Sequence, residues 1–220
     1  MSNISPLMLA IQNRDVEAAK TALERDASQA TAALPGGVSP LLFALYNGAP
    51  EIAALLKVFR EPDVFEAAAL NEPQLLARLL IGNPALLASF SVDGWTPLHL
   101  AALFGSRDAA LVLVGLGAPL GLASTNPMQN TPLHAAIAGA GGETLAPLLL
   151  ALGSDPLYIG GSGVSGLHLA ASRGFESLCR LLLARGADRL AKTEDGKTAA
   201  EIARERGHLA TAAALELIPG

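Results

Sequence analysis

The sequence is poor in three kinds of side chain, and each shortage removes a class of protein. Cys179 is the single cysteine among 220 residues, so the chain can form neither an internal disulfide framework nor a cysteine-rich zinc module. Aromatic residues make up only 4% and charged residues only 16%, whereas hydrophobic residues make up 51%. A chain this apolar and this poor in charge is typical of a well-buried folded protein and excludes a disordered tail.

The charge balance is acidic. Fifteen basic and 20 acidic residues give a formal net charge of −5, so no global positive field attracts nucleic acid or an anionic membrane. The first six residues carry no basic side chain, which argues against a signal peptide. The uncharged stretch from Ala109 to Ala123 is broken by glycine and proline and is shorter than the about 20 residues of a spanning helix. We expect no membrane association and a cytoplasmic protein.

A short motif recurs along the chain at a nearly constant spacing. It reads Thr-Pro-Leu-His at 96–99 and 131–134 and returns as Ser-Gly-Leu-His at 165–168. With the weaker copies, a Ser or Thr opens the motif at positions 5, 39, 96, 131, 165 and 198. A further copy opens at Asp63, 33 residues before the next copy but only 24 after the previous one. The sequence therefore predicts seven units, one of which has lost most of its preceding loop.

Each unit predicts two helices. The Ser or Thr is a helix N-cap, and the Pro that often follows suits the first helical position, where its missing N–H costs nothing. Nine residues after the cap, four units have a helix-ending glycine: Gly48, Gly105, Gly174 and Gly207. A second apolar helix follows and ends at Gly117, Gly153 or Gly186, because glycine suits the left-handed conformation that terminates helices.

This pattern resembles the ankyrin repeat family, which has a 33-residue unit and a Thr-Pro-Leu-His signature. The resemblance covers Ser5 to Glu216 and is most specific over residues 91–197. It implies an all-α solenoid of stacked antiparallel helix pairs with β-turn fingers. We expect a single domain over residues 1–220, with repeats starting near 5, 39, 63, 96, 131, 165 and 198 and with the first and last repeats as caps.

Three histidines in identical register, His99, His134 and His168, suggest a metal or catalytic site at first sight. Stacked helices lie about 8–10 Å apart, whereas zinc holds each nitrogen ligand at about 2.0–2.1 Å, so neighbouring repeats cannot share an ion in this way. The resemblance implies instead that each His is structural and bonds its own cap residue and the next loop. We expect no metal.

Other motifs also favour a structural interpretation. Residues 161–166 fit G-x-G-x-x-G, but a dinucleotide site also needs a preceding strand and a βαβ unit, which the turn-rich residues before it do not supply. Ser165 and His168 lack an orienting carboxylate, and Cys179 lies in an apolar run that favours a buried inert thiol. We expect no cofactor, no catalytic residue and no enzymatic activity.

In the ankyrin family, partners usually contact the finger tips and the concave face of the inner helix. Register, together with the fingers of the charge-poor stretch that contribute Met128 and Tyr158, gives a set of candidate partner-binding residues: Tyr46, Asn47, Trp95, Leu103, Phe104, Met128, Asn130, Tyr158, Ser172 and Arg173. Exposed aromatic anchors are typical of binding hot spots. The alternative is that some of these side chains pack between adjacent units.

Two further features bear on the binding surface. Between Ala109 and Ser172 the only charged residues are Glu143 and Asp155, which predicts either an exposed apolar patch or a buried stack interior with small loops. The lost loop predicts a notch between Phe59 and Asp63.

Together these features predict a non-enzymatic module that binds a protein partner through its concave face and fingers, as an adaptor or scaffold. The alternative is a stoichiometric inhibitor or immunity-type protein that occludes a target enzyme or effector. We expect a monomer, with a dimer left open, and neither nucleic acid nor membrane as partner.

Overall fold

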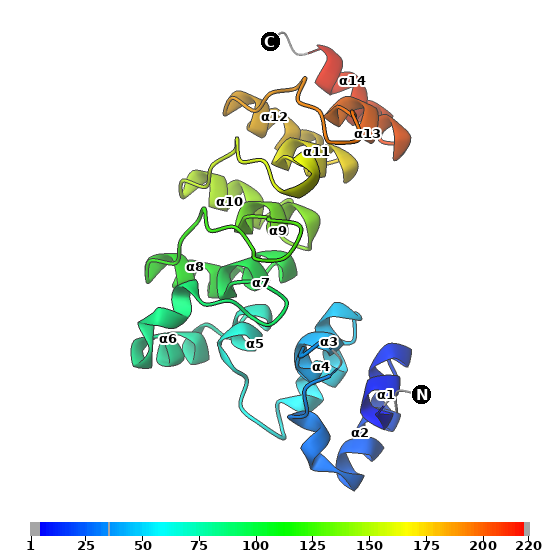
Figure 1. Ribbon diagram of the computed structural model, residues 1–220, viewed down its shortest axis with the longest axis vertical. Helices are drawn as coiled ribbons and strands as arrows, with labels where there is room; N and C mark the ends of the chain where they lie inside the picture. The colour runs from blue at the N-terminus through cyan, green and yellow to red at the C-terminus, as the bar shows by residue number, and fades with distance from the viewer. Residues whose placement is uncertain (1–4, 35, 218–220) are drawn as a thin grey trace. The chain divides into compact units, whose positions relative to one another are not determined.

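The computed structural model describes residues 5–34 and 36–217, and within them the chain is all-α, as the repeat pattern predicts. Fourteen α-helices follow one another as seven pairs in this described part (Figure 1): α1 (Pro6–Asn13) and α2 (Val16–Arg25), α3 (Pro40–Tyr46) and α4 (Pro50–Leu56), α5 (Val64–Ala69) and α6 (Pro73–Gly82), α7 (Pro97–Phe104) and α8 (Arg107–Gly115), α9 (Pro132–Ala138) and α10 (Leu145–Ala151), α11 (Gly166–Ser172) and α12 (Glu176–Ala184), α13 (Ala199–Glu205) and α14 (Leu209–Leu217). Three short 3-10 helices lie in the connections: η1 (Ala27–Ala30), η2 (Pro84–Ala88) and η3 (Gly161–Gly163).

The chain divides into two compact units, Met1–Glu66 and Ala67–Gly220. The organisation of residues 1–220 as a single domain stays a prediction.

The helix boundaries follow the capping residues. The side chains of Ser39, Thr96 and Ser165 accept hydrogen bonds from backbone N–H groups three residues on, which satisfies donors that the first turn leaves unpaired. Thr131 is the exception, since its side chain makes no bond to the backbone of its own helix. The predicted helix-ending glycines Gly48, Gly105, Gly174 and Gly207 all have positive φ angles, the conformation that favours glycine.

In the first unit, two helix pairs stack. Helix α1 packs against α2 and α3, and α2 packs against α4, so the apolar stripe of each helix is covered by a neighbour. The largest fully buried side chains of this unit are Leu7, Ile11, Leu23, Leu41, Ile52 and Leu56. Burying one such side chain contributes about 1.5–3 kcal/mol, so these contacts hold the pairs together.

A buried ion pair occupies the connection where the sequence lacks a loop. Glu66, at 0% exposure, pairs with the Arg60 guanidinium. It also accepts hydrogen bonds from the Ser39 hydroxyl at 2.5 Å and the Asp63 N–H at 2.9 Å. Arg60 Nε donates to the Ala30 carbonyl at 3.0 Å. The short connection therefore joins residues from the first three repeats through one carboxylate and one guanidinium.

In the second unit, the helices form two rows (Figure 1). Helices α7, α9, α11 and α13 pack in succession as the inner row, while α6 packs on α8, α10 on α12, and α12 on α14. Most residues of the inner helices α7, α9 and α11 are buried, whereas α13 buries only Ala199 and Ala203. Leu98, Leu100 and Leu133 of the inner row and Leu113 of α8 are among the fully buried side chains. Each pair thus covers the apolar face of the next, as repeat architectures require.

Candidate functional site

Four loops of the second unit precede inner helices and are stitched to one another by backbone hydrogen bonds. We call residues 90–95, 124–130, 158–164 and 190–197 the loop row. Thr125 N–H donates to the Gly94 carbonyl at 3.1 Å, Gly161 N–H to the Met128 carbonyl at 2.7 Å, and Glu194 N–H to the Ser162 carbonyl at 3.0 Å. These bonds fix the order and spacing of the loops, because each loop satisfies a backbone group of the next.

Glycine at position 161 is required by this stitching. A Cβ atom there would lie 2.3 Å from the Pro127 carbonyl oxygen, so a larger residue would push the two loops apart. Gly161 and Gly163 of the G-x-G-x-x-G match therefore serve contact between loops, whereas Gly166 lies in α11 and faces the side chains of Ile137 and Leu182. The residues before them, Ser154 to Ile159, contain no strand. A dinucleotide-binding βαβ unit is not formed by these residues.

The C-terminal ends of the inner helices are joined in the same way. We call Leu103, Phe104, Ala138, Gly139, Ser172 and Arg173 the helix-end row. Ala140 N–H donates to the Leu103 carbonyl at 2.8 Å, and the Arg173 guanidinium donates to the Ala138 carbonyl. Arg173 also lies over the Phe175 ring, 5.2 Å from its centroid. Its charge is exposed, but its position is set by these two contacts.

The histidines in register tie each helix start to the following loop. His99 Nδ1 accepts from the Thr96 N–H at 3.2 Å, so its Nε2 carries the proton and donates to the Asn130 carbonyl at 2.7 Å. His168 makes the equivalent bonds to Ser165 and to the Ala191 carbonyl. Burial lowers the pKa of His99 to about 4, which keeps the ring neutral at physiological pH.

His134 departs from this pattern. Its Nδ1 lies 2.9 Å from the Thr131 hydroxyl, but its Nε2 is buried without a hydrogen-bond partner. Burial lowers the pKa of His134 to about 4, and the nearby Val164 carbonyl acts in the opposite direction. The Tyr158 ring packs edge-on against the imidazole, with the ring centroids 5.6 Å apart. His134 therefore lacks the short Nε2 bond to the following loop that His99 and His168 make.

The structure separates the candidate partner-binding residues into three groups. Trp95, Met128, Asn130 and Tyr158 belong to the loop row, and Leu103, Phe104, Ser172 and Arg173 belong to the helix-end row. Tyr46 and Asn47 lie at the end of α3 in the first unit.

Trp95 and Phe104 lie at opposite ends of α7. An eight-residue helix is about 12 Å long, so these aromatic side chains flank the helix. The Trp95 ring packs against the His99 ring, with centroids 5.4 Å apart, and it is only partly exposed. Met128 is 58% exposed, whereas Tyr46 is 37% exposed and Asn130 is 9% exposed.

The charge-poor stretch of residues 109–172 contributes both core and surface. Leu113, Leu133 and Leu149 are buried, whereas Met128 and Ile159 are more than half exposed. The stretch thus supplies the interior of the stack and an uncharged portion of the loop row.

A hollow of about 350 Å³ lies in the loop row where two loops meet α11. Its walls are formed by Pro127, Met128, Asn130, Gly161, Ser162, Val164 and Leu169. The sequence predicts Met128 and Asn130 as partner contacts but does not predict that the residues opposite them form the other wall of this hollow. The glycine-rich segment 160–163 is the signal for that wall, because glycines permit an unusually close approach of two backbones.

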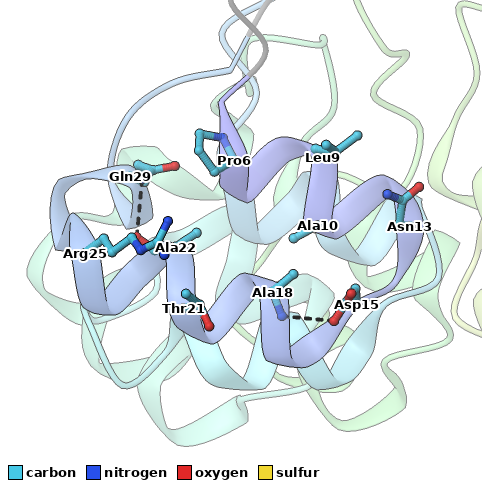
Figure 2. A pocket seen from close by; sticks show the side chains of 10 residues that line it. All are labelled: Pro6, Leu9, Ala10, Asn13, Asp15, Ala18, Thr21, Ala22, Arg25 and Gln29. Carbon is cyan, nitrogen blue, oxygen red and sulfur yellow. Dashed lines mark hydrogen bonds between the residues drawn. The ribbon is translucent and has the colours of Figure 1, made fainter.

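A second hollow, of about 490 Å³, lies between α1 and α2 (Figure 2). Pro6, Leu9 and Ala10 line it from α1, and Ala18 and Ala22 line it from α2. The Gln29 side chain closes one end, because its Nε2 donates to the Ala22 carbonyl at 3.3 Å and its Oε1 accepts from the Leu7 N–H at 3.2 Å. Among the described residues, no polar side chain that lines this hollow is both buried and without a hydrogen-bond partner.

The described residues do not assemble a reactive centre. No group of three or more His, Cys, Asp and Glu side chains in residues 5–34 and 36–217 is placed to hold a metal ion. Cys179 is buried, and burial raises the pKa of its thiol to about 12, so the nucleophilic thiolate is suppressed at neutral pH. Within the same ranges, no helix has the length and apolar character needed to cross a membrane.

Comparison with known proteins agrees with this geometry. The family model described as "Ankyrin repeats (3 copies)" matches residues 64–159, and the model described as "Ankyrin repeat" matches residues 162–194. The human protein "Neurogenic locus notch homolog protein 4" is 36% identical over 120 residues, which are 52% of this chain and 5% of that protein. The chain therefore matches only a small part of that relative. With its tandem helix pairs, capped Thr-Pro-Leu-His motifs and stitched loops, the chain belongs to the ankyrin repeat family.

Proposed function

We propose that this protein is a non-enzymatic module that binds one protein partner through the loop row and the helix-end row of its second unit. Ankyrin repeats are in general protein–protein interaction modules, and the family is generally non-enzymatic. The observation that carries the proposal for this chain is the stitching of successive loops and helix ends by hydrogen bonds. Such a surface is ordered before binding, so little conformational entropy is lost when a partner docks.

The chemistry of the surface supports a protein partner. Its loops 124–130 and 158–164 carry no charged side chain, and the two rows include Trp95, Phe104 and Tyr158, aromatic residues of the kind found at binding hot spots. The chain also lacks the positive field that nucleic acid requires. The absence of a disulfide partner for Cys179 suits a reducing compartment, and we include cytoplasmic residence in the proposal.

The experiment is affinity capture from a lysate of the source cells, with a surface variant beside the wild type. The test variant is Met128→Glu with Phe104→Glu, which places a charge in each row. The control variant is Ile81→Glu, on α6, where the side chain is 76% exposed. We expect a protein that the wild type and the control capture equally and that the test variant captures at least tenfold less, with circular dichroism unchanged.

Equal capture by all three proteins would contradict the proposal that these rows form the binding surface. The captured protein is then assayed for its own activity with increasing amounts of this chain. Loss of that activity at a one-to-one ratio would identify the stoichiometric inhibitor, whereas unchanged activity would identify the adaptor.

A further inference from the structure

We infer that the hollow between the loops 124–130 and 158–164, lined by Pro127, Met128, Asn130, Ser162, Val164 and Leu169, is an anchor pocket for one uncharged apolar side chain on an extended segment of the protein partner. This inference rests on the proposed function and adds the kind of side chain that the partner would insert into the hollow.

The walls of the hollow favour an uncharged occupant. None of the lining residues is ionisable, and only Glu143 and Asp155 are charged in the whole stretch from 109 to 172. A charged side chain entering the hollow would lose water and gain no counter-ion, which is costly. Pro127, Val164 and Leu169 offer apolar surface, so an aliphatic side chain gains free energy by leaving water there.

The size of the hollow suits a peptide segment. Pockets for drug-sized ligands span about 300–1,000 Å³, and this one, at about 350 Å³, is at the lower end of that range. It has room for one large aliphatic side chain and the peptide groups beside it.

Asn130 supplies a hydrogen-bond donor that the fold leaves poorly used. The residue is only 9% exposed, and its Nδ2 donates to the Met128 sulfur at 3.8 Å. A thioether is a weak acceptor, so a peptide carbonyl of the occupant is the better partner for this amide. The backbone around Asn130 is already fixed, because its carbonyl accepts from His99 Nε2 at 2.7 Å.

One wall can adjust to the occupant. The Met128 side chain is 58% exposed and unbranched, so it can swing aside at little cost. The backbone at Val164 is held in place, because its carbonyl accepts from the Gly160 N–H at 2.9 Å. The anchor pocket therefore combines fixed walls with one movable side chain, Met128.

The test uses methionine methyl NMR, because the chain contains only three methionines, at positions 1, 8 and 128. The probe is N-acetyl-leucine N-methylamide, and the N-acetyl N-methylamides of lysine and glutamate are the charged comparators. We expect a saturable shift of the Met128 methyl signal with the leucine probe, a dissociation constant in the millimolar range, and at least tenfold weaker binding of both charged probes. The Met8 methyl signal, from the first unit, stays unchanged.

Matched variants locate the binding site. Val164→Trp fills the pocket, and the fold already accepts Trp at this register in Trp95. Lys197→Trp places the same ring at the same register one loop further on, outside the pocket. We expect Val164→Trp to abolish the shift and Lys197→Trp to preserve it. Asn130→Val should weaken binding by about fivefold, the effect of losing one neutral hydrogen bond.

The inference is overturned if Met128 shows no saturable shift, if the charged probes bind as well as the leucine probe, or if Val164→Trp binds unchanged. If Val164→Trp loses its circular dichroism signal, the weakened binding of Asn130→Val decides the case. Partner capture that depends on the two rows, together with no probe binding, would retain the proposed function and reject the anchor pocket. Probe binding without row-dependent capture would reject the proposed function alone.

Discussion

Replacing Glu66 with Ala should cost the first unit more stability than the loss of any exposed ion pair. The Glu66 side chain is fully buried, and its partner Arg60 keeps only 18% side-chain exposure. Removing the carboxylate takes away the hydrogen-bonded counter-charge of that guanidinium and leaves only the weaker attraction of Asp63; breaking a buried pair costs about 3–5 kcal/mol. The Ser39 hydroxyl and the Asp63 N–H lose their acceptor in the same step.

The assay is amide hydrogen exchange combined with urea unfolding. Exchange is needed because the chain has two compact units and a single global transition is not assured for such a chain. Peptides covering residues 39–66 should exchange at least a hundredfold faster in Glu66→Ala, which corresponds to about 2.8 kcal/mol at about 1.4 kcal/mol for each factor of ten.

The control is Glu176→Ala, which breaks an exposed pair with Arg180 at 2.8 Å and should cost less than about 1 kcal/mol. A double variant, Arg60→Leu with Glu66→Leu, removes both charges and should be less destabilised than Glu66→Ala. If Glu66→Ala loses no more stability than Glu176→Ala, the ion pair does not hold the shortened connection and the reasoning is refuted.

Three further predictions follow from burial and close contact. Burial lowers the pKa of His99 and His134 to about 4 from 6.5, so the unfolded chain binds more protons between these values. The free energy of unfolding should therefore be highest above about pH 6.5 and should fall toward pH 4, by an amount on the order of 3 kcal/mol per histidine. A urea midpoint that stays the same between pH 7.5 and pH 5 would contradict this prediction. Gly139→Ala places a Cβ 2.0 Å from the Leu103 carbonyl oxygen of α7, so this variant should have a melting temperature several degrees below that of the wild type. Gly115 has open space around it, so Gly115→Ala should leave the melting temperature unchanged or raise it. Equal melting temperatures of the two variants would contradict the close contact at Gly139. Cys179, with its thiol pKa raised to about 12, should resist iodoacetamide in the native protein at pH 8 and react after denaturation, so rapid native labelling would show that it is accessible.

Much of the fold follows from local rules. The caps at Ser39, Thr96 and Ser165 and the glycines that end helices are set by residue type and by the hydrogen bonds that a helix end leaves unpaired. These signals recur at one spacing, so the helix pairs can be predicted from the sequence alone. The histidine register is also readable, because the same side chain follows the same cap.

The details of the surface depend on contacts between distant residues. Arg60 reaches the Ala30 carbonyl 30 residues away, and no period in the sequence signals that bond. The unpaired Nε2 of His134 likewise arises from the path of the loop 158–164, since the sequence at 131–134 is the same as at 96–99. Register identifies Asn130 as a candidate contact and the charge-poor fingers add Met128, but the hollow that these residues form with Val164 and Leu169 requires the three-dimensional arrangement.

The central claim is that a protein partner docks on the loop row and the helix-end row. The most direct measurement is hydrogen exchange of this chain with and without the captured partner. The account predicts slower exchange in the loops 90–95, 124–130 and 158–164 and at the C-terminal ends of α7 and α11, with no change in α8, α10 and α12. Protection confined to α8, α10 and α12 would contradict it and would place the partner on the outer helices.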